Sequence, residues 1–172
     1  MSEQSTSLDN WITSAITRQL PERRLSLSLE DAVALGGYAC LEAQAFDIPI
    51  VFSLVDACGH QRYFFSQDNA LLVSHSLAFQ KAWTAVALKM ATHELTPLVQ
   101  PGAELYGLQH EKGICCFGGG VPCWSRGALV GAIGISGGSV EQDLAIARNT
   151  LRRFSSEHFI LTSRKQPDIS EL

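Results

Sequence analysis

The sequence predicts one α/β domain, of the α+β kind, in which helices flank a single antiparallel β-sheet of about five strands. Short apolar runs rich in β-branched and aromatic residues are bounded by glycine, aspartate or proline, as is typical of strands joined by tight turns. Longer segments between them carry apolar residues at helical spacing, and two of these begin with a capping box. With 172 residues, 46% of them hydrophobic and 17% charged, the chain is long enough to build one well-formed core.

The chain divides into an N-terminal segment (residues 1–24), a central domain (25–156) and a C-terminal tail (157–172). In the first segment Ser7 can cap a helix that Pro21 ends. Its apolar stripe consists of Leu8, Trp11, Ile12, Ala15, Ile16 and Leu20. A helix this short is marginal alone in water, so we expect it to dock on its own domain, on an oligomer partner or on another protein.

The central domain opens with a helix, a hairpin and a second helix. Ser28 and Asp31 form a capping box for a helix that runs to about Phe46. Two strands follow, at 50–55 and 61–66, joined by a turn at 56–59 that contains Cys58 and is followed directly by His60. The longest helix spans about 70–89, and its pattern places Ala78, Trp83, Ala82 and Ala85 inward and Lys81 and Lys89 in solvent.

The second half predicts a further hairpin and helix. A strand at 114–117 is expected to stop at a glycine turn, 118–120, and a second strand covers 129–135. Turn residues lie at 125–127 between them. After Gly137 and Gly138, a capping box at Ser139 opens a helix, in which Glu141 and Asp143 are interpreted as cap and surface residues that could lie at a subunit contact.

This region carries a resemblance to a known family. FGGGVP, followed by VGAIGISGGSVEQD and preceded by VQPGAELYGLQH, is similar to the GlcG/HbpS-type haem-binding family, over about residues 27–154. That family includes the C-terminal domain of PduO-type adenosyltransferases and OrfY-like proteins of diol and glycerol operons. The resemblance implies a profilin-like GlcG/HbpS fold, a homo-oligomer (dimer or octamer) and haem as cofactor, with a corrinoid as the alternative tetrapyrrole.

The family's operons also suggest a cellular setting. Residues 7–20 resemble the encapsulation peptides that carry cargo into bacterial microcompartments, which makes a shell protein a candidate partner. The resemblance thus implies an accessory protein of corrinoid-dependent diol or glycerol metabolism, including propanediol utilization. Too few residues lie outside the match for an adenosyltransferase domain, so that activity is not expected.

His75 is the residue that we expect to bind haem iron. It precedes Ala78, Phe79 and Ala82 at helical spacing, so its imidazole would share an apolar wall with the Phe79 ring. The alternative is an ordinary solvated histidine near a helix N-terminus. His110 is a second candidate ligand.

Two further groups could bind haem or could have structural roles only. Cys115, Cys116 and Cys123 could supply a thiolate to haem iron, although buried structural cysteines are more common. The turn 137–139 could bind a haem propionate or could simply join strand to helix. His93 is interpreted as a surface residue.

Composition excludes several classes of protein. A net charge of −4 without a basic patch argues against nucleic acid, and no apolar run is long enough for a membrane span. The N-terminus lacks the pattern of a secretory signal, and five cysteines without regular spacing indicate reduced thiols, so we expect a cytoplasmic protein. No catalytic motif is present, and an enzyme is less expected than a binding protein. Haem degradation, and a microcompartment cargo or scaffold protein without cofactor, are the alternative functions.

Overall fold

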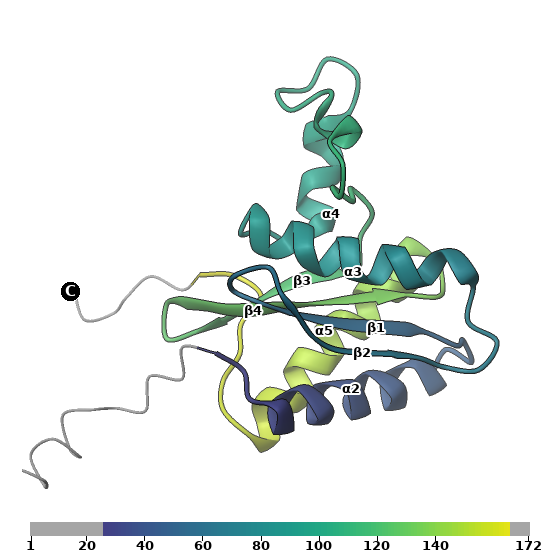
Figure 1. Cartoon of the computed structure of the whole chain (residues 1–172), viewed down its shortest axis with the longest axis vertical. Coiled ribbons are helices and arrows are strands. Elements are labelled where there is room, and N and C mark those ends of the chain that lie inside the picture. The colour runs from purple at the N-terminus through teal and green to yellow at the C-terminus, as the bar shows by residue number, and fades with distance from the viewer. Residues whose placement is uncertain (1–25, 166–172) are drawn as a thin grey trace, which may run out of the picture.

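A computed structural model describes residues 26–165, and in it four antiparallel strands form one sheet in the order β2-β1-β4-β3 (Figure 1). The elements in chain order are α2 (Leu29–Gln44), β1 (Val51–Asp56), β2 (Gln61–Ser66), α3 (Leu72–Ala87), α4 (Thr92–Leu95), the 3-10 turns η1 (Thr96–Val99) and η2 (Leu108–His110), β3 (Gly120–Ser125), β4 (Ala128–Ser136) and α5 (Val140–Glu157). The predicted class is confirmed, with four strands among the described residues in place of about five. The helix expected at residues 8–20 lies outside them.

Helices cover both faces of the sheet. Helix α3 packs on one face, whereas α2 and α5 pack side by side on the other (Figure 1). The larger core lies under α2 and α5 and contains Phe52, Ile133 and Phe154 among its fully buried side chains. A smaller apolar cluster lies between the sheet and α3. Strand β1 is buried along almost its whole length because both of its faces are covered.

Strand β2 forms one edge of the sheet, and its side chains alternate between exposed and half-buried. Tyr63 and Phe65 point to the α2 side, where they pack against the larger core. Phe64 points to the opposite face and is 38% exposed, because α3 lies mainly over β1, β4 and β3 and covers this face of β2 only in part. A strip of sheet beside α3 therefore remains open to solvent.

The strand expected at residues 114–117 is wrong: this segment is a loop, and the strand is β3, which begins at Gly120. Side chains bind the loop's backbone, since Thr84 Oγ1 accepts from the Cys115 amide at 2.9 Å and Thr96 Oγ1 donates to the Cys116 carbonyl at 2.6 Å. Gly120 serves close packing instead of a turn. A Cβ placed on it would lie 2.2 Å from the carbonyl oxygen of Lys81.

The predicted turn between β3 and β4 and the predicted starts of α2 and α5 agree with the structure. Arg126 and Gly127, both at positive φ, form the two-residue turn between β3 and β4. The capping boxes at Ser28 and Ser139 are both present. Each one satisfies backbone N–H groups that would otherwise lack partners, so helices α2 and α5 begin where the sequence predicted.

A segment that contains α4, η1 and η2 projects from the body of the molecule (Figure 1). Beyond α5 the chain returns to the sheet, where Thr162 and Trp124 exchange two backbone hydrogen bonds of 2.8 and 2.9 Å. Leu161, next to this bridge, is buried. No helix within residues 26–165 has the length and apolarity that a bilayer crossing requires.

Candidate functional site

His75 lies on the exposed side of the first turns of α3, among large apolar side chains that are also exposed. Leu71 and Leu72, one turn before it, are 60% and 86% exposed. From strand β2, the Phe64 ring meets the His75 ring edge-on, with centroids 5.7 Å apart. Phe79, one turn later, is half-buried against the smaller apolar cluster. We call Phe64, Leu71, Leu72, His75 and Phe79 the His75 patch.

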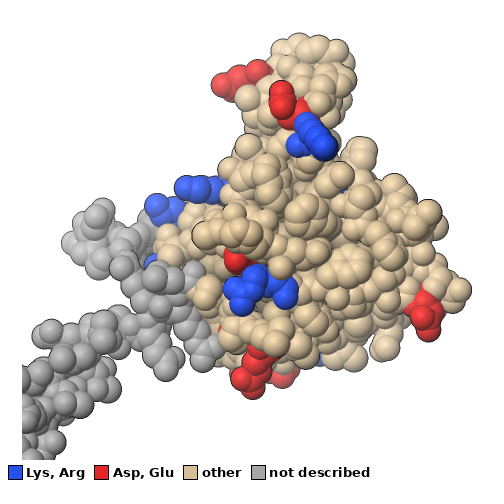
Figure 2. All heavy atoms as spheres, viewed as in Figure 1, with Lys and Arg blue, Asp and Glu red and all other residues tan. Residues whose placement is uncertain are grey.

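The apolar side chains exposed around His75 are not all those that helical spacing predicted. Ala78 and Ala82 are fully buried and face the sheet, where a Cβ on Gly134 would lie 2.0 Å from the Ala78 carbonyl oxygen. The alanines therefore let α3 approach β4 closely and are not available to a ligand. The exposed apolar surface comes from Leu71 and Leu72 at the start of α3 and from β2, and sequence spacing could not connect β2 with His75. Figure 2 shows few charged side chains over α3.

The other histidines lie elsewhere. His110 is exposed at the end of η2, in the projecting segment, and His60 is exposed in the β1–β2 turn, 3.5 Å from Asp56. His93 is half-buried, and its Nε2 lies 2.9 Å from an Arg148 guanidinium nitrogen. Burial, followed by the charge of Arg148, lowers the pKa of His93. His158 also lies beside aromatic rings, but its ring stacks on the buried Phe154 at 4.5 Å and its Nε2 lies 3.3 Å from the Tyr38 hydroxyl. Of the five histidines, His75 is the one that lies beside the exposed apolar side chains of the patch.

The cysteines fit structural roles. Cys115 and Cys123 are buried and Cys116 is half-buried. Burial raises the pKa of all three thiols, and that of Cys123 to about 12. A raised pKa keeps the thiol protonated near neutral pH, whereas a metal ligand must be a thiolate. The five cysteines all carry free thiols, and the described residues contain no cluster of three or more metal-binding side chains.

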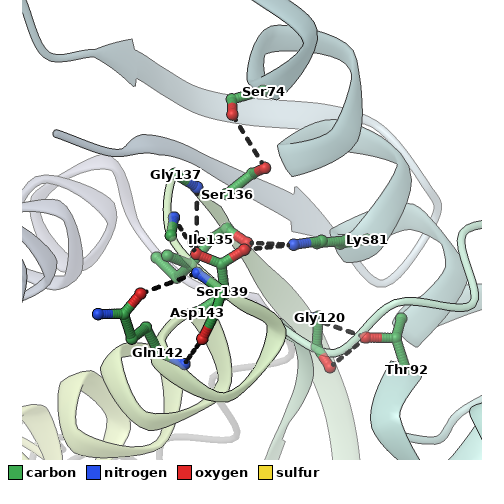
Figure 3. A network of polar contacts seen from close by, with 11 residues as sticks. Ser74, Lys81, Thr92, Gly120, Ile135, Ser136, Gly137, Ser139, Gln142 and Asp143 are labelled. Atoms are coloured by element: carbon green, nitrogen blue, oxygen red, sulfur yellow. Dashed lines mark hydrogen bonds and ion pairs between the residues drawn. The ribbon is translucent and has the colours of Figure 1, made fainter. Parts of the chain in front are cut away.

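The backbone amides of the glycine turn are already occupied. Gly137 and Gly138 donate to Asp143 Oδ1 at 3.1 and 2.9 Å, and the Ser139 amide donates to Gln142 Oε1 at 2.9 Å (Figure 3). A carboxylate of the chain itself thus takes the place that a propionate would have at this helix N-terminus. Of the two interpretations of residues 137–139, the structure therefore supports a turn that joins β4 to α5.

Lys81, which was expected in solvent, and Asp143, which was interpreted as a cap or surface residue, form a buried ion pair. The Lys81 Nζ lies 2.6 Å from Asp143 Oδ2 and donates to the carbonyl oxygen of Ile135 at 3.0 Å (Figure 3). Both side chains are 3% exposed. The pair connects α3, on one face of the sheet, with the N-terminus of α5 on the other. Burial raises the pKa of Asp143, and the charge of Lys81 acts against that rise.

The sequence contained a signal for this pair. Lys81 falls on the buried stripe of α3, three residues after Ala78 and four before Ala85. Lysine is rarely buried without a partner, so the pattern could have been taken as a sign of a buried acidic partner. Nothing in the spacing identified Asp143, which lies 62 positions further on.

The chain is similar to known proteins over most of its length. It is 47% identical over 145 residues to the corrinoid adenosyltransferase PduO of Citrobacter freundii, which covers 83% of this chain and 43% of that relative. The chain therefore spans less than half the length of this curated relative.

Two solved structures share its fold and sequence. A PduOC:heme complex is 45% identical, with a TM-score of 0.74, over 81% of this chain and 99% of the other. Klebsiella pneumoniae ORFY is 38% identical with the same TM-score, over 77% and 92% of the two chains. A family model described as haem degrading protein HbpS-like matches residues 27–152. This chain therefore belongs to the HbpS-like family.

Proposed function

We propose that this protein binds haem at the His75 patch and acts as an accessory protein. The observation that carries the proposal is an exposed imidazole among large, solvent-exposed apolar side chains, an arrangement that monomeric proteins seldom keep without a ligand or partner. The similarity to a protein solved as a PduOC:heme complex supports haem as that ligand.

The residues present fit the group. Among the described residues no hydrogen bond or ion pair holds the His75 ring nitrogens, so one nitrogen is free to bind iron. Phe64, Leu71, Leu72 and Phe79 would cover one face of the porphyrin and exclude water from it. Haem would supply a redox-active iron, and the patch would hold and orient it.

Titration with hemin, followed in the Soret region, tests the site. His75→Ala is expected to abolish the low-spin spectrum or shift it strongly. His60→Ala is the matched control, because that histidine is also exposed but lies at the β1–β2 turn, 3.5 Å from Asp56. An unchanged spectrum for His75→Ala, together with a changed one for His110→Ala or a cysteine variant, would identify a different ligand. A parallel titration with a corrinoid tests the alternative tetrapyrrole.

The proposed setting is corrinoid-dependent diol or glycerol metabolism in the cytoplasm, inside a bacterial microcompartment. Similarity to part of a corrinoid adenosyltransferase supports the pathway. For the location, residues 7–20 would act as an encapsulation peptide that binds a shell protein through the stripe at Leu8, Ile12 and Ile16. A fluorescent protein fused behind residues 1–24 should co-purify with shells and should lose this property on Ile12→Glu/Ile16→Glu.

Haem degradation is the second candidate, because the family description names it. An enzyme would consume bound haem with oxygen and reductant even when catalase removes peroxide. Loss of the Soret band under those conditions would favour degradation, whereas protection by catalase would indicate non-enzymatic coupled oxidation. A protein that gives no Soret change with hemin at all would be a cargo or scaffold protein without cofactor.

A further inference from the structure

The outward face of α2 carries an apolar stripe that nothing in the described residues covers. Leu29, Val33 and Leu41 are 63%, 50% and 50% exposed, and they recur every fourth residue together with Gly37. A Cβ built on Gly37 would meet no atom within 4 Å, so the stripe has a shallow point near its centre. The core side of the same helix is already filled by Ala32, Leu35, Ala39 and Ala43. The stripe is therefore additional to what the domain needs for its own core.

The segment that precedes the described residues joins them close to the start of this stripe. The described residues begin at Ser26, three positions before α2, and the 25 residues before it include a segment with a matching pattern. Leu8, Ile12, Ile16 and Leu20 also recur every fourth residue. The connection from Pro21 to Ser28 has the length of a common helix–helix loop. Fully extended, it spans more than the roughly 8–10 Å between packed helix axes.

We propose that residues 8–20 pack antiparallel on the outward face of α2 as the second helix of an αα-hairpin. In this register Leu20 meets Leu29, Ile16 meets Val33 and Leu8 meets Leu41. Ile12 then lies over Gly37, where the missing side chain leaves room for it. Rows of residues spaced by four pack with the two helix axes inclined by about 50°, so the central pairs make the closest contacts.

This docking would regulate the targeting role of the same segment. The side chains that would contact α2 are those that would bind a shell protein, so one segment cannot do both at once. The regulatory part rests on the proposed targeting function, whereas the docking itself does not. A shell partner would then have to displace the segment from α2 before it could bind.

Amide hydrogen exchange on the full-length protein tests the docking. Exchange of residues 8–20 is expected to be at least tenfold slower than in the free peptide of that sequence. Gly37→Glu should abolish the protection and leave the domain folded, because no atom of the described chain approaches that position. Val33→Glu/Leu41→Glu should act likewise. Val140→Glu/Ile160→Glu, at exposed apolar positions outside α2, is the matched control and should keep the protection.

The inference fails if residues 8–20 exchange at the free-peptide rate. It also fails if their protection survives all of the α2 variants. Protection that appears only with rising protein concentration would also overturn it, because the occupant of the stripe would then be a second copy. Shell binding by the fusion to residues 1–24 is a separate measurement. Targeting can thus fail while docking holds, and the reverse. If both hold, Gly37→Glu should increase the amount of full-length protein bound to shells.

Discussion

At the scale of single residues, Lys81 and Asp143 show how a buried charge is accommodated. Each charge has lost its water, and each has partners that replace it: Ile135 O for the ammonium and two backbone amides for the carboxylate. Removing one member of such a pair typically costs about 3–5 kcal/mol, because the other charge stays buried without its partner. An exposed pair is worth about 0–1 kcal/mol.

Lys81→Met should therefore lower the free energy of unfolding by about 3–5 kcal/mol. Arg153→Met is the matched control, since Arg153 bonds Glu42 at the surface and should cost about 1 kcal/mol or less. Urea denaturation measures both. The double variant Lys81→Met/Asp143→Asn should recover part of the loss, because no net charge is then left buried. Equal costs for Lys81→Met and Arg153→Met would contradict this account.

Cys123 gives a prediction about pH. Burial raises the pKa of its thiol from 9.0 to about 12, so between these values the unfolded chain releases a proton that the native state keeps. The stabilisation is complete below pH 9 and declines as pH rises toward 12, by about 1.4 kcal/mol per unit. Urea midpoints from pH 8 to 10.5 should fall more steeply for the wild type than for Cys123→Ala. Parallel slopes would show that this thiol does not couple to folding.

At the scale of elements, two glycines should respond oppositely to the same substitution. Gly134 in β4 faces α3 so closely that an added Cβ would lie 2.0 Å from one backbone atom of the helix and 2.8 Å from another. Gly134→Ala should displace α3 and destabilise the domain by several kcal/mol, since overpacking and backbone shifts add together. A melting temperature close to that of the wild type would contradict the close contact between α3 and β4.

Gly37 in α2 is the matched case, because its Cβ would meet nothing within 4 Å. In the Ile12→Glu/Ile16→Glu background, which removes the proposed contact of residues 8–20 with α2, Gly37→Ala should raise the free energy of unfolding by about 0.5–1 kcal/mol through helix propensity. The same thermal melts measure both variants. Destabilisation by Gly37→Ala would mean that another surface packs tightly against this point of α2.

At the scale of the whole molecule, exposed apolar residues gather on two faces, the His75 patch and the outward stripe of α2. The family resemblance predicts a homo-oligomer, and exposed apolar side chains outside these two faces, Tyr106 and Phe117 among them, give it a physical reason. Light scattering should give a mass that is a multiple of 18.7 kDa. A monomer at all concentrations, with and without hemin, would contradict this prediction.

Much of the fold follows from the sequence because its causes are local. The capping boxes at Ser28 and Ser139 act within four residues, and the turn at Arg126 and Gly127 needs only its own backbone. Helical and strand periodicity located α2, α3, β1, β2 and β4. The motif around the glycines identified the family, which the comparison with known proteins confirmed.

The tertiary structure determined the contacts between residues that lie far apart in the sequence. The loop at 114–117 resembles a strand in composition, yet side chains of Thr84 and Thr96 bind its backbone in place of a neighbouring strand. Lys81 is paired with a carboxylate 62 positions away, on the helix that packs on the other face of the sheet. The apolar surface around His75 includes Phe64 of β2, which α3 covers only in part. Sequence periodicity reports which side of an element is apolar, but only packing determines which element meets it, and that choice formed both the ion pair and the candidate site.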